Sequence, residues 1–214
     1  DVYKRQTLHS LEPSQPVNIQ DVEDNFYNKT FARLTKVEKL IPFAQKEFIK
    51  INGTYYRNVF ASKEELKEAI KTIYPEEFKL IHGDCTFSNL MFDTFNMKAI
   101  LIDPRGYFGK TKFYGDADYD WAKLYYSIKG EYDQFNRKKF TLDIKEKEVE
   151  LAIKPNNWSD MEDFFFECLP QVSRYKIKLL HAIIWLSLTT YVWEDYDSIC
   201  GAFYNGVLKL GEVL

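Results

Sequence analysis

The chain has 214 residues, of which 45% are hydrophobic and 17% aromatic, and its formal net charge is −3. This length and apolar content predict one substantial core, formed as one domain or one large lobe. The lack of a basic excess argues against a nucleic-acid partner. The three cysteines, Cys85, Cys168 and Cys200, lack metal-ligand spacing, so we expect reduced thiols in a cytoplasmic protein.

The first part of the chain predicts a linker followed by helices. Residues 1–17 are rich in turn-forming residues and are expected to form a loose lead-in. Apolar residues then recur at near-helical spacing over residues 18–41 until Pro42, which predicts one long helix. A capping-box sequence that starts at Ser62 predicts a second helix, which ends at Pro75.

The middle of the chain predicts a small β element that carries polar loops. Three short strands are expected, at residues 78–82, 90–92 and 98–103. Asp84 and Asn89 then fall on the loop between the first two strands, and Asp103 falls at the end of the third.

The second half predicts mostly helices. The expected elements are a helix from Asp116 to about Gly130, a hairpin at 140–144 and 149–153, a helix from Ser159 that ends before Pro170, and two long helices at 172–194 and 197–213. The longest apolar stretch, Leu179 to Trp193, is shorter than the ~20 residues of a membrane span. It predicts a central, buried helix.

The candidate catalytic side chains occur in two short segments. The first is Ile81-His82-Gly83-Asp84, in which Asp84 lies five residues before Asn89. The second is the apolar run Ile100-Leu101-Ile102, which ends at Asp103. Phosphoryl transfer from ATP uses one carboxylate that receives the proton of the acceptor hydroxyl. It also uses a carboxylate and an amide oxygen that hold Mg²⁺ on the phosphates. The three side chains occur here in the order that kinase catalytic loops use.

This pattern resembles the aminoglycoside phosphotransferase and choline kinase family, whose signature is His-Gly-Asp-x-x-x-x-Asn and then a hydrophobic run and Asp. The resemblance implies an α+β, mainly helical fold: the C-terminal lobe of a protein-kinase-like phosphotransferase, with a small β element that carries the catalytic loop. It implies transfer from ATP, with Mg²⁺, to a hydroxyl of a small metabolite such as a sugar, an amino alcohol or an aminoglycoside-like compound.

The expected roles follow from the same residues. Asp84 would orient and deprotonate the acceptor hydroxyl, Asn89 and Asp103 would hold the metal, and His82 would brace the loop. Ser88 is a weaker candidate for a phosphate contact. Each residue alone also has a structural interpretation, since His-Gly-Asp is common in turns; the combination favours the functional one.

The segment after Asp103 departs from the commonest form of the family, because Arg105 follows two residues later. Its guanidinium could pair with Asp103 or Asp120, or bind an anionic group of the substrate or the departing phosphate. Lys110, on the same Gly-flanked loop, is a further candidate for a phosphate contact. The sequence Pro-Arg-Gly-Tyr-Phe-Gly resembles the corresponding segment of those family members that are found among bacterial surface-polysaccharide enzymes.

The segment from Gly115 to Leu124 resembles the family's downstream Gly-Asp…Tyr-Asp motif. There Asp120 is expected as a structural acid at a helix start, bonded back toward the catalytic loop. Asp116 and Asp118 also form an Asp-x-Asp pattern, which leaves a metal-dependent nucleotide-sugar transferase as a less favoured alternative. N-terminal capping is the better explanation of that pair.

The resemblance covers about residues 15–214, with the kinase-like lobe expected at 18–214, and it omits a nucleotide-binding lobe. The first 75 residues are expected to hold only helix and loop, without a glycine-rich hairpin or a strand lysine for the phosphates. The chain starts Asp1-Val2-Tyr3 and has its first methionine at Met91, which predicts a fragment that is inactive by itself. A kinase-like lobe that binds a partner or metabolite without catalysis is the other alternative.

The later helices are expected to build the acceptor pocket. Their aromatic surface comes from Tyr125, Tyr126, Trp158, Trp185 and Trp193, most of which are expected in the core.

Overall fold

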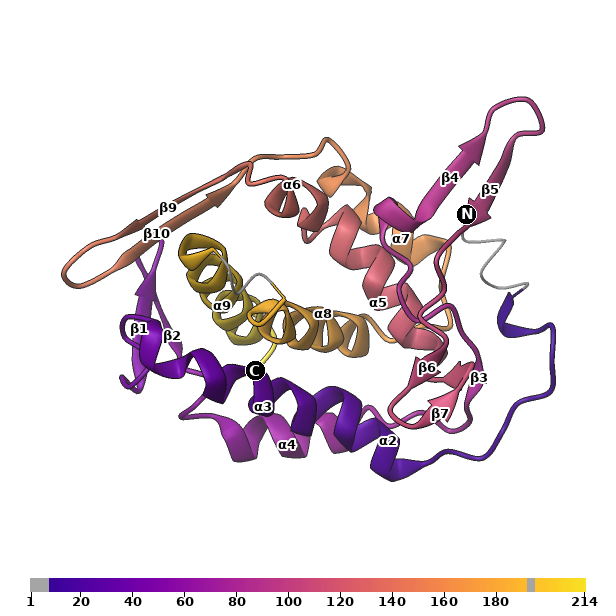
Figure 1. The fold of residues 1–214 in the computed structure, drawn as a ribbon, viewed down its shortest axis with the longest axis horizontal. Helices are drawn as coiled ribbons and strands as arrows, with labels where there is room; N and C mark the ends of the chain where they lie inside the picture. The colour runs from indigo at the N-terminus through magenta and orange to yellow at the C-terminus, as the bar shows by residue number, and fades with distance from the viewer. Residues whose placement is uncertain (1–7, 192–194) are drawn as a thin grey trace.

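The computed structural model describes residues 8–191 and 195–214, and its fold is mixed α/β with more helix than strand (Figure 1). The α-helices are α2 (Ile19–Glu23), α3 (Lys29–Val37), α4 (Lys63–Lys71), α5 (Ala117–Ile128), α6 (Tyr132–Asn136), α7 (Glu162–Glu167), α8 (Arg174–Leu188) and α9 (Tyr196–Gly211). The strands are β1 (Phe48–Ile51), β2 (Thr54–Arg57), β3 (Lys79–Leu80), β4 (Leu90–Asp93), β5 (Lys98–Leu101), β6 (Tyr107–Phe108), β7 (Thr111–Lys112), β8 (Tyr114–Gly115), β9 (Phe140–Ile144) and β10 (Val149–Ile153).

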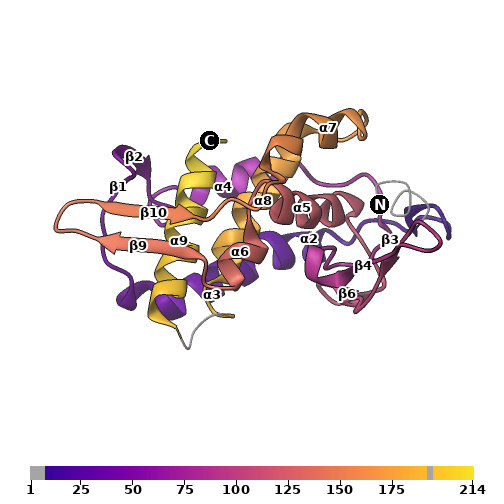
Figure 2. The same cartoon turned by 90° about the horizontal axis from the view of Figure 1, so that it is seen from above.

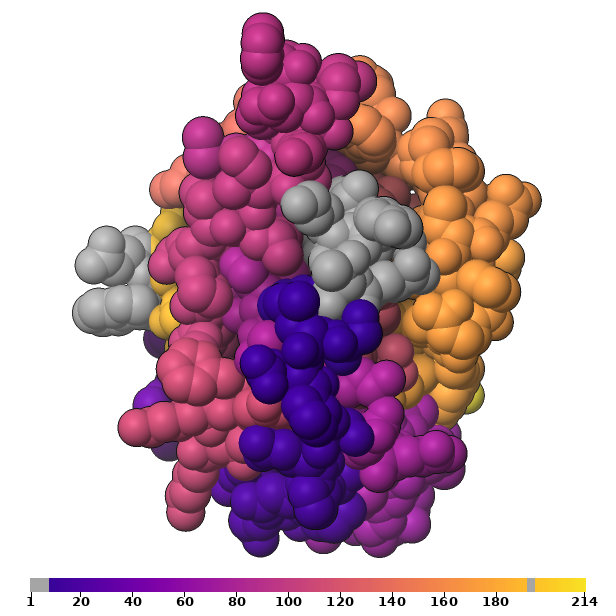
Figure 3. All heavy atoms as spheres, turned by 90° about the vertical axis from the view of Figure 1, so that its right-hand side faces the viewer, coloured from indigo at the N-terminus to yellow at the C-terminus, as the bar shows by residue number. Residues whose placement is uncertain are grey.

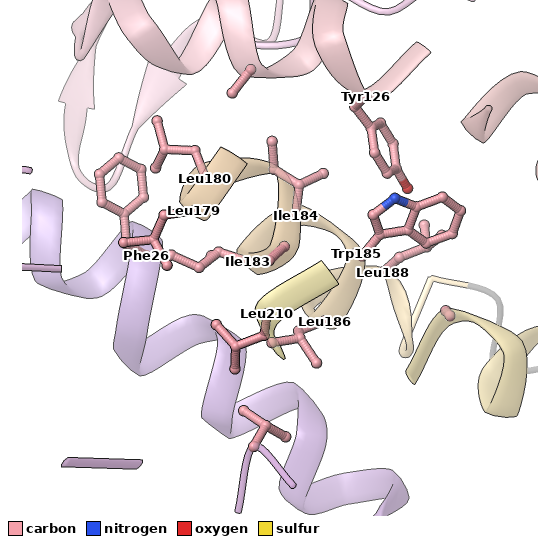
Figure 4. Close-up of a cluster of buried hydrophobic side chains, with 14 of the residues drawn as sticks. Phe26, Tyr126, Leu179, Leu180, Ile183, Ile184, Trp185, Leu186, Leu188 and Leu210 are labelled. Carbon is pink, nitrogen blue, oxygen red and sulfur yellow. The ribbon is translucent and has the colours of Figure 1, made fainter. Parts of the chain in front are cut away.

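Helix α8 is the centre of the molecule, as its nearly all-round apolar sequence predicts. It packs against α9, α5 and α3, and most of its residues are buried (Figure 2). Its side chains lie among those of Phe26, Tyr126 and Leu210, which come from three other elements (Figure 4). The helix ends at Leu188, earlier than predicted, and residues 192–194 of the predicted range lie outside the described residues.

The long helix predicted at residues 18–41 is confirmed, with two departures from regular α geometry. Helices α2 and α3 are joined by a π-helical segment, Asp24–Asn28, and the run ends in a 3₁₀ turn, Glu38–Leu40. Its apolar face rests on α8, where the Thr30 and Ser187 hydroxyls lie 2.8 Å apart. π-Helical turns of this kind are frequent at functional sites.

A four-stranded sheet in the order β2-β1-β10-β9 lies at one end of the molecule. The hairpin β9–β10 was predicted, whereas the expectation of only helix and loop before residue 75 is wrong. The missed hairpin β1–β2 turns at Asn52-Gly53, and Asn-Gly is a strong signal for a two-residue turn. Strand β1 then pairs in parallel with β10, where Ile51 faces Val149.

Three two-stranded ladders at the other end carry the polar loops. Strands β4 and β5 form the predicted hairpin, while β3 is shorter than expected and pairs with β8. The short hairpin β6–β7 was not predicted. In the β4–β5 ladder Leu90 faces Leu101, and Ile102 N–H donates to the Asn89 carbonyl at 3.1 Å. This register brings the segment that precedes Asp103 beside Asn89.

The predicted linker, residues 1–17, is packed onto the body over its described part. Gln15 and Phe78 exchange two backbone hydrogen bonds of 2.8 Å, and His9 is buried. Figure 3 shows this N-terminal segment, in indigo, lying across the molecular surface. Within the predicted lead-in, residues 10–16 are exposed, while His9 and the Gln15 bridge attach the segment to the body; residues 1–7 lie outside the described part of the chain.

Helix α4 forms where the capping box predicts it, but without the predicted cap. The Ser62 hydroxyl donates to the Asn58 carbonyl at 3.0 Å and makes no bond to the helix N-terminus. Asp116, Ser173 and Asp195 do accept N-terminal bonds, at the starts of α5, α8 and α9. Within the described ranges, no helix is long and apolar enough to cross a membrane.

Asn52 connects the β1–β2 turn to the sheet. Its side chain accepts from Leu151 N–H at 2.8 Å and donates to the Leu151 carbonyl at 2.9 Å, with φ of 49°. We expect Asn52→Ala to destabilise the protein by about 2–3 kcal/mol, because it loses both bonds and strains the backbone. Asn52→Gly keeps the backbone relaxed and should cost about 1–2 kcal/mol. Urea unfolding would measure both; equal, near-zero losses would contradict this role.

Candidate active site

The three residues of the kinase-like pattern come together around the loop between β3 and β4. The Asn89 amide donates to the Asp84 carbonyl at 2.8 Å and to Asp84 Oδ2 at 3.1 Å. Lys123 Nζ, on α5, lies 3.0 Å from Asp84 Oδ1. Both oxygens of the Asp84 carboxylate are therefore held by donors, which fixes its direction. Asp103 lines the same cleft as Asp84.

His82 braces the loop, as the resemblance implies. Its Nε2 lies 2.8 Å from the Ile102 carbonyl, and its Nδ1 accepts from Asp84 N–H at 3.3 Å. The His82 carbonyl in turn accepts from Arg105 N–H at 2.8 Å. One imidazole thus connects the backbone of Asp84 to the residue that precedes Asp103.

Asp120 is the buried acid that the sequence predicts behind the loop. Its carboxylate is fully buried and accepts from His82 N–H at 2.9 Å and from Gly83 N–H at 2.7 Å. His9 Nε2 lies 3.1 Å from the same carboxylate. Burial raises the pKa of Asp120, but His9 and the two amides outweigh it, so the pKa lies below its ordinary value.

The backbone conformation of the loop requires a glycine at position 83. Its φ is +82°, in the left-handed region, and a Cβ there would lie 3.0 Å from the Arg105 Cβ. The glycine of the His-Gly-Asp sequence thus lets the loop turn toward the Asp120 carboxylate while Arg105 packs closely against it.

The cleft beside Asp84 has a volume of about 430 Å³. Its walls come from α3, α5, α6, α8 and the loops that follow β3 and β5. The lining residues are Lys29, Arg33, Asp84, Asp103, Arg105, Tyr107, Tyr119, Lys123, Tyr126, Tyr132, Asn136, Ile184, Ser187, Leu188 and Tyr191. Basic groups outnumber acidic ones among them, and tyrosines make up much of the rest.

Asn89 and Asp103 suit Mg²⁺ in the type of their donor atoms. Because the Asn89 amide nitrogen bonds to Asp84, its oxygen is the atom presented to a cation. Asp103 is exposed, with φ of 55°, and forms no salt bridge with the described residues. No group of three or more acidic, His or Cys ligands exists in the described ranges. Mg²⁺ needs only one or two protein oxygens when phosphates and water complete its shell.

Two of the predicted phosphate contacts lie apart from the cleft. Ser88 is exposed, and its hydroxyl lies 2.8 Å from that of Thr86. Lys110 is exposed on the β6–β7 turn, where its N–H donates to Asp21 at 2.9 Å. Neither residue lines the cleft. Arg105 does line it, and in the described structure it forms neither of the salt bridges expected with Asp103 or Asp120.

The two carboxylates of the Asp-x-Asp pattern, Asp116 and Asp118, both pair with one lysine. Lys176 Nζ lies 2.9 Å from both Asp116 and Asp118, and Asp116 also caps α5 through Asp118 N–H at 3.0 Å. Burial, chiefly, raises the pKa of Asp116 to about 6. An ammonium group between the two carboxylates favours the capping interpretation over a divalent-metal site.

Several residues of the cleft were not predicted. Lys123 bonds to Asp84, and its sequence signal is a lone lysine within the apolar stripe of α5. Lys29 and Arg33 stand four residues apart, so they share one face of the helix. Burial, with the charges of Arg105 and Arg33, lowers the pKa of Lys29 to about 6.

Of the aromatic residues expected in the acceptor pocket, Tyr126 lines the cleft. Tyr125 donates to Glu162 at 2.7 Å and lines a different, smaller pocket. Trp185 is fully buried in the core, and Trp158 packs edge-on against Phe87. Trp193 lies outside the described residues.

Searches of protein-family models, curated proteins and solved structures gave no match to this chain.

Asp120→Asn would show whether the buried carboxylate holds the loop. An amide offers one acceptor oxygen and points N–H groups at donors, so we expect a loss of about 2–4 kcal/mol at neutral pH. Because the folded pKa of Asp120 is lowered, its contribution is present above its unfolded pKa and is lost as pH falls through the folded value. The variant should lack that acid-dependent part in urea unfolding. The exposed Asp163→Asn is the control, and equal losses in both would contradict the role.

Lys29→Met should stabilise the protein at neutral pH. The folded pKa is about 6 and the unfolded value is near 10.5, so the unfolded chain binds more protons between them. Wild-type stability should therefore rise with pH across this window. We expect the variant to gain about 1–3 kcal/mol at neutral pH, a gap that narrows toward pH ~10. Denaturant unfolding across this range measures it, with exposed Lys36→Met as the control; a gap that widens with pH would contradict the assignment.

Proposed function

We propose that this chain is the catalytic lobe of an ATP- and Mg²⁺-dependent phosphotransferase that acts on a hydroxyl of a small metabolite. The observation that carries the proposal is the direct contact of Asp84 with Asn89 beside a cleft that Asp103 also lines. Asp84 and Asp103, nineteen positions apart in the sequence, line the same cleft, and Asn89, which does not line it, contacts Asp84. A volume of about 430 Å³ suits a small metabolite.

The reaction assigned to this site balances as follows. The acceptor oxygen forms a bond to the γ-phosphorus of ATP, and the bond from that phosphorus to the bridging oxygen of ADP breaks. The acceptor proton passes to Asp84, so the products are ADP and a phosphate monoester. Lys123 and Asn89 keep the Asp84 carboxylate aimed at the hydroxyl. Mg²⁺ bound to Asn89 and Asp103 would offset the charge of the phosphates.

The proposal includes a nucleotide-binding lobe beyond these residues, because the lysine of strand β1, Lys50, pairs with Glu148 and does not line the cleft. The hairpin β1–β2 packs instead on β10 and α9. The β4–β5 hairpin projects from the body (Figure 1), with Phe95 93% and Met97 73% exposed. A lone apolar hairpin is marginal in water, which supports a covering lobe at this place.

Cytoplasmic function accords with the use of ATP and with the buried thiol of Cys200. The segment from Asp103 to Gly109 keeps surface-polysaccharide metabolism as the proposed setting. A kinase-like lobe that binds a metabolite without catalysis remains the second candidate, favoured if the complete gene product shows no ATP turnover.

Asp84→Asn in the complete gene product tests the catalytic assignment. We expect kcat for ATP-dependent phosphorylation to fall by a factor of about 10²–10⁴, because the hydroxyl proton loses its acceptor. Asp163→Asn should keep the wild-type rate, because Asp163 pairs with Arg174 and neither residue lines the cleft. A coupled assay for ADP, with direct detection of the phosphorylated product, measures both. Full activity in Asp84→Asn would reject the role.

A further inference from the structure

Three cations of the cleft have no carboxylate partner among the described residues. Arg33 donates to the Ser187 carbonyl at 2.9 Å and to the Tyr191 hydroxyl at 3.0 Å. Arg105 lies over the Tyr107 ring, 4.5 Å from its centroid. Lys29 is the third, and it donates a hydrogen bond to the Asn25 side chain. These contacts orient the three basic side chains but bring no carboxylate to any of them.

The same three cations lie close together. Asn25 Oδ1 accepts from Lys29 Nζ and, at 3.5 Å, from Arg105 Nη2, so the two groups share one oxygen. The lowered pKa of Lys29 arises from burial and then from Arg105, Arg33 and Lys123. Half-buried like charges are costly in the free protein, so Lys29 largely gives up its proton at neutral pH, while Arg33 and Arg105 stay charged. An anion in the cleft would remove that cost.

Tyr126 gives a second, independent sign of a ligand. It is only 1% exposed and lines the cleft, and its hydroxyl has no hydrogen-bond partner in the part of the chain that the structure describes. Its ring stacks on that of Tyr132 with centroids 4.4 Å apart, which holds it in place. Buried hydroxyls are nearly always bonded, so an orphan in a cleft wall indicates a missing polar partner.

We propose, on the basis of the function proposed above, that the hydroxyl acceptor is itself a phosphate monoester of a sugar or polyol. Lys29, Arg33 and Arg105 bind its phosphate, and a hydroxyl of the same molecule faces Asp84. The tyrosines of the cleft offer hydroxyls and ring faces to the polyol. Cationic acceptors, such as aminoglycosides and choline, are excluded by the same charges.

A phosphate fits these cations better than a single carboxylate does. Guanidinium groups bind phosphate oxygens through two parallel bonds, and a dianion matches several cations at once. Two of the three basic residues, Lys29 and Arg33, stand on the long N-terminal helix, whereas Arg105 lies two residues after Asp103, in the segment to which the metal is assigned. The acceptor therefore accounts for Lys29 and Arg33 better than the ATP phosphates do.

Binding to this chain, without ATP or Mg²⁺, separates the inference from catalysis. Isothermal titration would compare glucose 6-phosphate and glycerol 3-phosphate with glucose, glucuronate and an aminoglycoside. We expect binding of at least one phosphate monoester, weakened by salt, and at least tenfold weaker binding of every other compound.

Variants assign the binding to the three cations. Arg33→Gln and Lys29→Met should each weaken phosphate monoester binding at least tenfold, which corresponds to about 1.4 kcal/mol. Lys36→Gln, an exposed cation of the same helix outside the cleft, should leave it unchanged. Circular dichroism would confirm that each variant is folded.

The inference is overturned if neither phosphate monoester binds, if glucose, glucuronate or the aminoglycoside binds as tightly, or if Arg33→Gln weakens only Mg²⁺-ATP binding. Asp84→Asn should still bind the monoester, because the substitution removes a negative charge. Monoester binding without any ATP-dependent phosphorylation in the complete gene product would reject the proposed function alone. Phosphorylation of a neutral or cationic acceptor would reject the anionic acceptor alone.

Discussion

The carboxylate of Asp120 is the constraint from which the geometry of the site follows. The carboxylate is fully buried. The cost of burying its charge is offset because two backbone amides of the loop and the His9 ring bond to it. The bonds run from the start of α5 to His82 and Gly83. Since Asp84 follows directly, the helix that supplies Lys123 also sets where the Asp84 backbone lies.

From there a chain of contacts extends to the metal-binding candidates. The His82 ring bonds to the Asp84 amide and the Ile102 carbonyl, and the β4–β5 ladder places Ile102 against Asn89. Asn89 returns to Asp84 through its amide. Hydrogen bonds therefore hold the loop at His82, Asp84 and Asn89. The packed core around α8 supports it.

The cleft itself holds an unfavourable arrangement that the core has to offset. Burial and the charges of Arg105 and Arg33 lower the pKa of Lys29 to about 6, and Tyr126 keeps a buried hydroxyl without a partner in the described structure. Such features lower stability and are typical of binding sites, where a ligand completes what the protein leaves open. Anion binding and fold stability should consequently be coupled through these residues.

Much of the fold follows from local patterns in the sequence. Apolar periodicity predicted α5, α8, α9 and the β9–β10 hairpin. Residue types, their order and the resemblance to a kinase family selected Asp84, Asn89, Asp103 and Asp120. The β1–β2 hairpin was within reach, since Asn52-Gly53 is a turn signal. Other features depend on contacts between distant segments: His9 meets Asp120 across 111 positions, and Arg33 meets Ser187 across 154. Lys110 and Ser88 lie near the catalytic segments in sequence but outside the cleft. Sequence proximity does not determine which way a side chain points.

The most direct measurement is mass spectrometry of products formed by the complete gene product with Mg²⁺-ATP and a mixed set of phosphorylated, neutral and cationic hydroxyl compounds. We predict that a sugar or polyol phosphate gains one further phosphoryl group while ATP becomes ADP. ATP-dependent product on none of the compounds, or only on neutral or cationic ones, would contradict the account.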